Sequence, residues 1–534
     1  MKRILRFILL ALVSPSILVA GTIHVPADHE TIQSAIDAAE GGDIIEVATG
    51  TYRERIVLKP GITVRSGGGN DKGKFGLTRA EATIIDGGGK SGDAPGVTMA
   101  EGAVLDGFTI TRVGVYDEEQ WKKHWDEQGE NQSHEHIGQS GIPAIAITGI
   151  HCTVTTNIVR HNGDTGIAIV GVEGTTTAPR VSGNICFRNM GGGIGSMKGS
   201  TALIDGNTCF ENLYAGIGHN GASPLVTRNL CYNNVRAGIG VSAGSSPVVR
   251  KNRCYGNRRA GIGIRTGTDT RPVVEDNDCY ENEMAGIGVE DEAAPVVRSN
   301  RCYRNKLAGI GCQNGSSPLL ADNHCFENKA AGIGVNSASP LLLRNRLEKN
   351  EAAGIGIRGT SKARVLDNTC LENRLVAIGI PDGAEAVLQN NTLVRTGGMP
   401  PIIAILGGSR AVLINNTIKG GGVAGVLLEG NLNAMGNVIE GQKGGAGILL
   451  RKDSEAILTG NRISGYRTPV SDQGTKFIVN NDQPEEEAAT EKRNEPPVRE
   501  RPATQEPSDG RPLGGDGSMF YRVFVSRNDK KVMA

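Results

Sequence analysis

The sequence has no excess of either charge and few aromatic side chains. Its 534 residues carry 57 basic and 57 acidic side chains, so the formal net charge is +0. This balance gives no overall attraction to nucleic acid or to an acidic membrane surface. Aromatic residues make up only 4% of the chain, which argues against a core of bulky side chains. After residue 21 no apolar run approaches the length of a membrane span.

The N-terminus has the pattern of a targeting segment. Residues 1–21 have a basic start, an apolar stretch from Phe7 to Val19, and small residues at positions 20 and 21. The pattern predicts a secretory signal peptide, with an uncleaved anchor as the alternative. The mature chain is therefore expected to be secreted or periplasmic, with no membrane span after signal removal.

Glycine, in contrast, is abundant, and it recurs in a regular motif. The chain has 76 glycines, and Gly-Ile-Gly returns every 22 to 25 residues; its copies start at Gly193, Gly216, Gly238, Gly261, Gly286, Gly309, Gly332 and Gly354, with Ala-Ile-Gly at Ala377. Such a period indicates a solenoid, propeller or array. Each repeat has room for two or three short strands and no helix. It therefore predicts an all-β parallel solenoid whose equivalent residues stack about 4.8 Å apart.

Cysteine and asparagine hold fixed positions in the repeat. Each repeat carries two asparagines, such as Asn300 and Asn305, which we expect to form and satisfy the turns. Eight of the ten cysteines share one coil position, where Leu347 replaces Cys in one coil. This replacement indicates an apolar core site. Stacked cysteines at about 4.8 Å have Cβ atoms too far apart for disulfides, so we predict buried free thiols, with a soft-metal ladder as the alternative.

Two outward lanes are candidate binding faces. In the stretch Ala285–Val289, alternation predicts that Gly286 and Gly288 face outward and the other three residues face the core. A bare glycine strip either eases coil geometry or lets a partner or glycan approach closely. The residue after seven of the eight lane cysteines is aromatic and could stack sugar rings or pack a coil corner; these residues are Phe187, Phe210, Tyr232, Tyr255, Tyr280, Tyr303 and Phe326.

The segment before the repeats predicts a helical cap. Residues 31–39 have the apolar spacing of one helix face, and short β-type runs follow. Together with the coil pattern of residues 150–465, this opening resembles that of pectate-lyase-like right-handed parallel β-helix proteins; its matching elements are Val25-Pro26, Ile32-Gln33, Ala35-Ile36, Gly42-Asp43, Gly50-Thr51-Tyr52 and Glu54. The resemblance implies a right-handed β-helix solenoid over residues 22–480, with 22–25-residue coils and an N-terminal capping helix. It also implies polysaccharide lyase, epimerase, hydrolase or esterase activity, although the local active-site signatures of such enzymes are absent.

The repeat is interrupted once at length, by residues 116–142. Asp117 and Gln120 are placed as an N-cap and its partner, so a helix is predicted to start at Glu118. Trp121 and Trp125, the only tryptophans, would lie one turn apart on one face. Loops that leave a rigid scaffold commonly carry specificity.

Candidate site residues come mainly from this insert. The catalytic candidates are His134, Glu135, His136, Asp126 and, in the next coil, His161; the substrate-binding candidates are Trp121, Trp125, Arg160, Arg265 and Arg358. Imidazole and carboxylate groups could act as general acid and base. The His134-x-His136 spacing matches no strong metal motif, so no metal site is assigned, and a divalent cation such as calcium is left open as a cofactor. A solvated amphipathic lid is the alternative for the insert.

Composition changes after the coils. Residues 481–517 are rich in Pro, Glu and Arg and are predicted to form a disordered linker. Residues 518–534 contain a strand-like run, which could pair with an exposed sheet edge or dock on a partner protein.

Three functions are consistent with these features. The first is an exported polysaccharide-binding β-helix, with lyase or epimerase activity on acidic polysaccharide through the insert as its enzymatic form. The second is a non-enzymatic surface or periplasmic scaffold, with a protein partner on the glycine strip or the C-terminal strand. The third, a periplasmic factor for metal-site maturation, is disfavoured by the absence of CxxC and Met-rich clusters. No nucleic-acid partner is expected.

Overall fold

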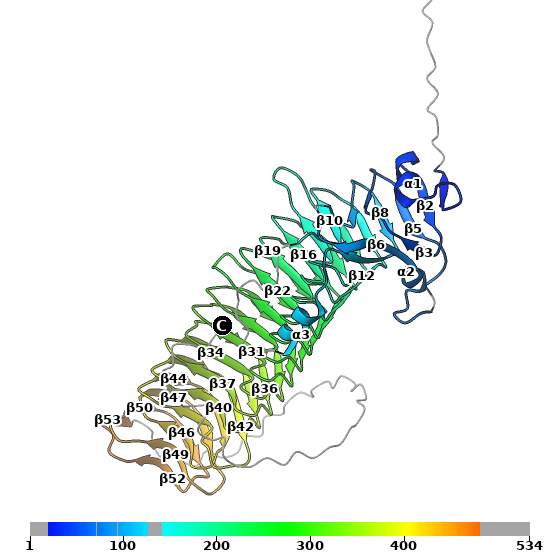
Figure 1. The fold of residues 1–534 in the computed structure, drawn as a ribbon. Coiled ribbons are helices and arrows are strands. Elements are labelled where there is room, and N and C mark those ends of the chain that lie inside the picture. The colour runs from blue at the N-terminus through cyan, green and yellow to red at the C-terminus, as the bar shows by residue number, and fades with distance from the viewer. Residues whose placement is uncertain (1–19, 71, 93, 127–140, 481–534) are drawn as a thin grey trace, which may run out of the picture. The chain divides into compact units, whose positions relative to one another are not determined.

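The chain folds into stacked β-coils. The computed structural model describes residues 20–70, 72–92, 94–126 and 141–480, in two compact units. Unit 1 comprises the described residues up to 126 and from 141 to 258, and unit 2 comprises 259–480. The strands of each unit run parallel in three sheets, A, B and C, and each full coil contributes one strand to each sheet (Figure 1). The predicted signal peptide, up to residue 19, lies outside the described residues.

Unit 1 contains the N-terminal coils. Its sheet A holds β1 (Thr22–Val25), β2 (Ile44–Val47), β5 (Thr63–Ser66), β8 (Val104–Asp106), β11 (Thr153–Thr155), β14 (Arg180–Ser182), β17 (Leu203–Asp205), β20 (Leu225–Thr227) and β23 (Val248–Arg250). Its sheet B holds β3 (Gly50–Tyr52), β6 (Thr83–Lys90), β9 (Thr109–Val113), β12 (Ile158–Arg160), β15 (Ile185–Phe187), β18 (Thr208–Phe210), β21 (Leu230–Tyr232) and β24 (Arg253–Tyr255). Its sheet C holds β4 (Ile56–Val57), β7 (Val97–Thr98), β10 (Ile145–Thr148), β13 (Ile167–Val170), β16 (Ile194–Met197), β19 (Ile217–Asn220) and β22 (Ile239–Ser242).

Unit 2 continues the same plan. Its sheet A holds β26 (Val273–Glu275), β29 (Val296–Arg298), β32 (Leu319–Ala321), β35 (Leu341–Leu343), β38 (Lys362–Leu366), β41 (Glu385–Gln389), β44 (Arg410–Ile414), β47 (Asn431–Met435), β50 (Glu455–Thr459) and β53 (Phe477–Asn480). Its sheet B holds β27 (Asp278–Tyr280), β30 (Arg301–Tyr303), β33 (His324–Phe326), β36 (Arg346–Glu348), β39 (Thr369–Leu371), β42 (Thr392–Arg395), β45 (Thr417–Gly420), β48 (Val438–Glu440) and β51 (Arg462–Ser464). Its sheet C holds β25 (Ile262–Ile264), β28 (Ile287–Val289), β31 (Ile310–Gln313), β34 (Ile333–Asn336), β37 (Ala353–Arg358), β40 (Val376–Ile380), β43 (Ile403–Ile405), β46 (Ala424–Leu428), β49 (Ala446–Leu450) and β52 (Thr468–Asp472).

Short helices complete unit 1. The predicted capping helix is confirmed as α1 (Ile32–Ala38), which starts at a Thr31–Ser34 capping box and buries Ile32, Ala35 and Ile36 against the first coil. Helix α2 (Thr78–Ala82) has too few residues to show a hydrophobic period and was not predicted. Helix α3 (Glu118–Asp126) lies in the insert and starts where the sequence predicted. Within the described residues, no helix is long and apolar enough to cross a membrane.

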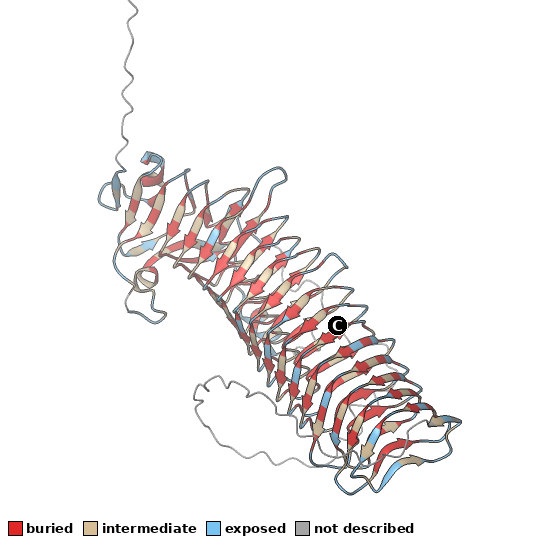
Figure 2. Cartoon of the chain, turned by 180° about the vertical axis from the view of Figure 1, so that it is seen from behind, coloured by how far each residue is buried: buried red, intermediate tan, exposed pale blue. Residues whose placement is uncertain are grey.

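The core of each unit is built from in-register lanes of like residues. Sheet B supplies the Cys lane, in which Cys209 pairs in register with Cys231 and Cys302 with Cys325. Buried residues alternate with partly or fully exposed ones along the strands (Figure 2). All ten cysteines are buried free thiols, which confirms the prediction, and burial raises the pKa of Cys302 well above its usual value. These thiols are therefore poor nucleophiles and poor metal ligands while the coils stay closed.

Asparagine side chains form ladders along the corners on either side of sheet B. Within unit 1, Asn207 Nδ2 donates to Asn229 Oδ1 at 3.0 Å and to the Val181 carbonyl at 2.9 Å, so one side chain links neighbouring coils. The second corner repeats this arrangement, with Asn212 Nδ2 donating to Asn234 Oδ1 at 3.1 Å. Each ladder amide is buried and bonded. The predicted role of the asparagines in satisfying the turns is therefore confirmed, but the left-handed turn residues are their neighbours, such as Arg228 before Asn229.

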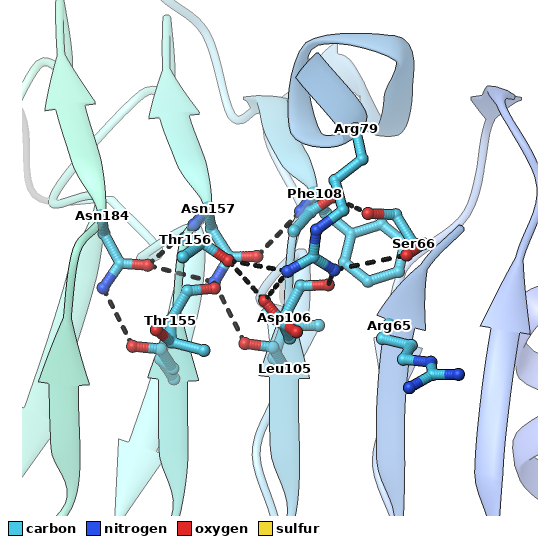
Figure 3. Close-up of polar contacts among 12 residues, drawn as sticks. Arg65, Ser66, Arg79, Leu105, Asp106, Phe108, Thr155, Thr156, Asn157 and Asn184 are labelled. Carbon is cyan, nitrogen blue, oxygen red and sulfur yellow. Dashed lines mark hydrogen bonds and ion pairs between the residues drawn. The ribbon is translucent and has the colours of Figure 1, made fainter. Parts of the chain in front are cut away.

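An arginine closes the first ladder at its N-terminal end (Figure 3). Phe108 holds the ladder position in the preceding coil, and its amide donates to Asn157 Oδ1 at 2.9 Å. Arg79 of α2 reaches over this coil, pairs with the Asp106 carboxylate and donates to Thr156 Oγ1 at 3.1 Å. The Arg79 side chain is only 12% exposed. Helix α2 thus serves the architecture by satisfying polar groups where the ladder starts.

The glycine strip differs from its prediction. In the stretch that contains β28, Gly288 faces outward as expected, but Gly286 is buried and Ala285 is partly exposed. A Cβ on Gly286 would lie 2.7 Å from the Gly309 carbonyl oxygen and 2.8 Å from Asn305 Nδ2. The prediction for Gly286 was wrong because side-chain alternation holds only within a strand. Strand β28 begins only at Ile287, and the two preceding residues form a coil corner. The bare outer strip therefore contains one glycine per coil.

The core of unit 1 contains one buried histidine, which should make stability depend on pH. His219 Nδ1 lies 2.6 Å from Ser196 Oγ, whereas His219 Nε2 is buried without a hydrogen-bond partner among the described residues. Burial lowers the pKa of His219 to about 3 from a usual 6.5. The unfolded chain therefore binds a proton before the folded chain does, so stability should fall as the pH drops from 6.5 towards 3. We expect a loss of about 2–3 kcal/mol between pH 7.5 and pH 4.5.

The measurement is guanidinium unfolding at both pH values, with a variant that removes the buried pair. Val241 occupies the lane of His219 in the next coil, so the double substitution Ser196→Ala/His219→Val is compatible with the core. This variant should lose the part of the pH dependence that comes from His219. An unchanged difference between pH 7.5 and pH 4.5 would show that His219 does not contribute.

Candidate functional site

Helix α3 packs on one corner of unit 1. Trp121 is 4% exposed and contacts a lane of apolar side chains contributed by three successive coils, Met190, Leu213 and Val235. The N-cap is as predicted, since Gln120 N donates to Asp117 Oδ1 at 2.9 Å. Helix α3 is thus held on the coils of unit 1 by a hydrophobic anchor.

Both tryptophan rings are engaged with protein groups. Trp121 and Trp125 stack with centroids 5.3 Å apart, and Trp121 Nε1 donates to the Glu211 carbonyl at 2.7 Å. The guanidinium of Arg188 lies 3.7 Å from the centroid of Trp121, and that of Arg258 lies 4.4 Å from the centroid of Trp125. These cation–π contacts occupy the ring faces that a sugar would need. Trp121 and Trp125 therefore fix α3 in place in this arrangement.

Arg188 connects the helix to the coils through two carboxylates. Its guanidinium lies 2.8 Å from Glu118 and 2.6 Å from Glu211. Tyr116 donates its hydroxyl to Glu118 Oε2 at 2.6 Å, and this bond, with the charge of Arg188, lowers the pKa of Glu118. Burial raises the pKa of Tyr116, so its hydroxyl stays protonated at neutral pH. One guanidinium faces two carboxylates here, so this network carries one net negative charge.

Arg160 and His161 lie beside that network. An Arg160 guanidinium nitrogen lies 3.3 Å from His161 Nδ1, and both side chains are half-buried. Among the described residues, no carboxylate forms an ion pair with Arg160. Burial and the charges of Arg160 and Arg188 lower the pKa of His161, so its imidazole is neutral at pH 7. The pair therefore combines a fixed positive charge with a neutral base.

Aromatic rings surround the imidazole. His161 meets Tyr116 edge-on with centroids 4.8 Å apart and Phe187 at 5.7 Å. Arg160 is in register with Phe187, so the Arg160–His161 pair lies at the end of the aromatic lane of sheet B. Together these residues offer an anion-binding group, a proton acceptor and a protonated phenol from neighbouring segments.

The aromatic lane itself presents ring edges. Phe187, Phe210, Tyr232 and Tyr255 stack in unit 1 with centroids 4.7 to 5.0 Å apart and nearly parallel planes. The same arrangement joins Tyr303 to its neighbours in unit 2. Rings that cover each other's faces leave only edges for a ligand, whereas sugars stack on faces. The lane is therefore a packing element along most of its length.

The other predicted site residues are placed as follows. Asp126 is exposed at the end of α3. Arg265 and Arg358 lie on unit 2 in the lane beside the glycine strip, with Glu290, Gln313 and Asn336 between them. Arg265 and Arg358 are therefore four coils apart, about 19 Å, and do not form one site. His134, Glu135 and His136 lie outside the described residues.

Several residues of the cluster were missed by sequence reasoning. Arg188, Glu211 and Tyr116 join only through contacts between segments up to 72 residues apart. One signal was available, because the coil position after the second Asn is apolar at 190, 213 and 235 but charged in unit 2, as at Lys306. An apolar lane on the outside of a solenoid indicates a docked element.

Unit 2 carries a second polar cluster that was also not predicted. His324 Nε2 lies 2.7 Å from Glu348 Oε1, and Arg346 lies 2.6 Å from the other oxygen of Glu348. His324 and Arg346 are thus both paired with Glu348. Within the described residues, no group of three or more His, Cys, Asp or Glu side chains is placed to hold a metal ion.

Comparisons with known proteins agree with this architecture. The family model described as "Right handed beta helix region" matches residues 135–271 and 261–393. The right-handed β-helix that the sequence resemblance implied is therefore confirmed for these residues. A search of curated proteins finds no match.

Solved structures with a similar coil arrangement are distant. They include the A-module of the mannuronan C-5 epimerase AlgE4 from Azotobacter vinelandii, at 15% identity and a TM-score of 0.30, covering 84% of this chain and 94% of that chain. The periplasmic alginate epimerase AlgG has 11% identity and a TM-score of 0.31, covering 72% and 82%. The catalytic unit of an α-1,3-glucanase from Streptomyces thermodiastaticus has 13% identity and a TM-score of 0.30, covering 70% and 61%. At these identities and scores nothing about activity follows.

Proposed function

We propose that the chain is an exported protein that binds an acidic polysaccharide on unit 1, at Arg160 and His161. The observation that carries the proposal is the half-buried Arg160, for which no described residue supplies a carboxylate, although Arg112 and Arg188 nearby are both paired. A partly desolvated guanidinium without a paired carboxylate favours an anionic ligand, and a planar carboxylate fits its geometry. A uronic acid unit of a polysaccharide carries such a group.

The same cluster could support lyase or epimerase chemistry. Removal of a proton beside a carboxylate becomes easier when a cation neutralises the carboxylate, which is the role proposed for Arg160. Neutral His161 can accept that proton, because its pKa is lowered. Tyr116, whose pKa is raised, can supply a proton to a leaving glycosidic oxygen. His134, Glu135, His136 and Asp126 stay candidates for additional acid–base roles.

Substitution of Arg160 tests the binding proposal. Arg160→Gln should weaken binding of a polyuronate oligosaccharide about 10- to 100-fold, because a charge-assisted contact to the carboxylate is lost. The measurement is titration calorimetry with oligogalacturonate and oligomannuronate, and a neutral glucan oligomer should not bind. In parallel, the ultraviolet absorbance of unsaturated products tests lyase activity, which His161→Gln should abolish if His161 is the base.

Arg112→Gln is the matched control. Arg112 lies one coil away on the same corner but pairs with Asp86 at 3.3 Å, and its side chain is 55% exposed. This variant should change affinity less than about twofold. Equal effects of the two substitutions, or no polyuronate binding by the unmodified protein, would refute the proposed site.

A non-enzymatic scaffold is the second candidate. It is favoured by the stacked rings of the aromatic lane and by the tryptophans, whose ring faces contact each other and arginine side chains. These contacts leave few ring faces for sugars. In that case a protein partner would lie on the outer glycine strip or on the C-terminal strand. A metal-maturation role is not supported, because the thiols it would use are buried.

A further inference from the structure

The last coil of unit 2 exposes residues that belong to core lanes. Ile478 follows Ala456 in register, yet Ala456 is 1% exposed and Ile478 is 36% exposed. Ile463 and Val470 are also partly exposed, although the residues before them in their lanes are fully buried. These lanes still carry apolar residues in the last coil. The residues are exposed because no further coil among the described residues covers them.

The strand edges of this coil are open as well. Strands β51, β52 and β53 pair only with the preceding coil in the described part of the chain. Tyr466 folds back over one corner, where its hydroxyl donates to the Gly420 carbonyl, but it does not cover sheet A. Unpaired edges above an exposed core are an aggregation hazard that solenoids remove with a cap. At the opposite terminus, unit 1 has α1 for this purpose.

The chain outside the described residues begins at this edge. Asn480 ends β53, and 54 residues follow it. They contain one apolar strand-like run, Met519–Val525, in which alternation places Met519, Tyr521, Val523 and Val525 on one face. The 38 residues between Asn480 and Met519 are more than enough to lead from the end of β53 back to its own edge.

We propose that residues 519–525 add to β53 as a further strand of sheet A and cover Ile478. The added strand would satisfy the open edge of β53 and place its apolar face over the exposed end of the core. The occupant is the chain's own C-terminus, because it is tethered to the edge that it would cover and therefore has a high effective concentration there.

Hydrogen exchange of the strand edges tests this inference. In the full chain, the amides of β52 and β53 should exchange at least about tenfold more slowly than in a chain that ends at residue 517. The peptide of residues 518–534, added in trans to the shortened chain, should restore protection. The full-length variant Val523→Asp/Val525→Asp should behave like the shortened chain. Because this variant keeps the complete tail, it tests the proposal even if truncation impairs folding.

The control and the contrary outcomes are defined by the same measurement. Ser526→Asp/Asn528→Asp adds the same charge just outside the run and should leave protection intact. Equal exchange in the full and shortened chains would overturn the proposal. Protection that disappears on dilution, together with dimers in sedimentation analysis, would assign the edge to a second copy and would also overturn it.

Discussion

Replacing Gly309 by alanine should destabilise unit 2 by about 3 kcal/mol, as expected when an atom is forced into a closed corner. A Cβ there would lie 2.7 Å from the Gly332 carbonyl oxygen, 2.8 Å from Asn328 Nδ2 and 2.8 Å from Cys325 Cβ. The first two groups belong to the backbone stack and the asparagine ladder, which cannot move without breaking hydrogen bonds to neighbouring coils. The measurement is the free energy of unfolding in guanidinium.

Gly311 is the matched control, two residues away in the same coil. The nearest heavy atom to a Cβ there is Ala285 Cβ at 3.7 Å, an ordinary contact. Gly311→Ala should therefore leave stability within about 0.5 kcal/mol or raise it slightly by restricting the unfolded chain. Similar losses in the two variants would mean that the backbone conformation requires glycine at both positions. The close contacts at the corner would then not be the cause of the loss.

The pair also decides what the repeated Gly-Ile-Gly means. The first glycine is required where the chain turns beneath the ladder, and the same close contacts recur at Gly286, Gly332 and Gly354. A Cβ on the second glycine would make only ordinary contacts, so glycine is not required there by packing within the coil. If Gly311→Ala folds normally, the coil itself does not explain why the outer strip lacks side chains. An explanation outside the coil, such as a closely bound partner, is then needed.

Much of the fold was predictable because a solenoid repeats one environment. Stacking places residues 22 to 25 apart in the same surroundings, so the Cys lane, the asparagine ladders and the coil length could all be read from spacing. Helix α1 was predictable for a local reason, its apolar period. The corner glycine was not, because side-chain alternation holds only within a strand and β28 has three residues.

The candidate site was predictable only in part. The insert and the start of α3 follow from local signals, and Arg160 and His161 were named from their place beside the insert. The burial of Trp121 and the pairing of Arg188 with Glu118 and Glu211 depend on which coil the helix meets. Such contacts between distant segments are set by three-dimensional packing, and a single sequence does not contain them explicitly.

The asparagine ladder gives the largest expected effect, because each member satisfies groups in three coils. Asn300 Oδ1 accepts from Asn277 N at 3.0 Å and from Asn277 Nδ2 at 2.9 Å, while its Nδ2 donates to Asn323 Oδ1 and to the Val274 carbonyl. Asn300→Ala removes these bonds at a position with 0% exposure. Each buried group left unsatisfied costs about 1–3 kcal/mol, so we expect a loss of about 4 kcal/mol in unfolding free energy.

Two further variants separate hydrogen bonding from packing in this ladder. Asn336 is partly exposed on the outer face, so Asn336→Ala should change stability by less than about 0.5 kcal/mol. Asn300→Asp keeps the shape of the side chain but turns its donor into an acceptor that faces Asn323 Oδ1 and the Val274 carbonyl. If Asn300→Asp is as damaging as Asn300→Ala at pH 7, the loss comes from mismatched polar groups. If Asn300→Asp is tolerated, the cavity left by alanine is the main cause, and the ladder contributes through volume more than through its hydrogen bonds.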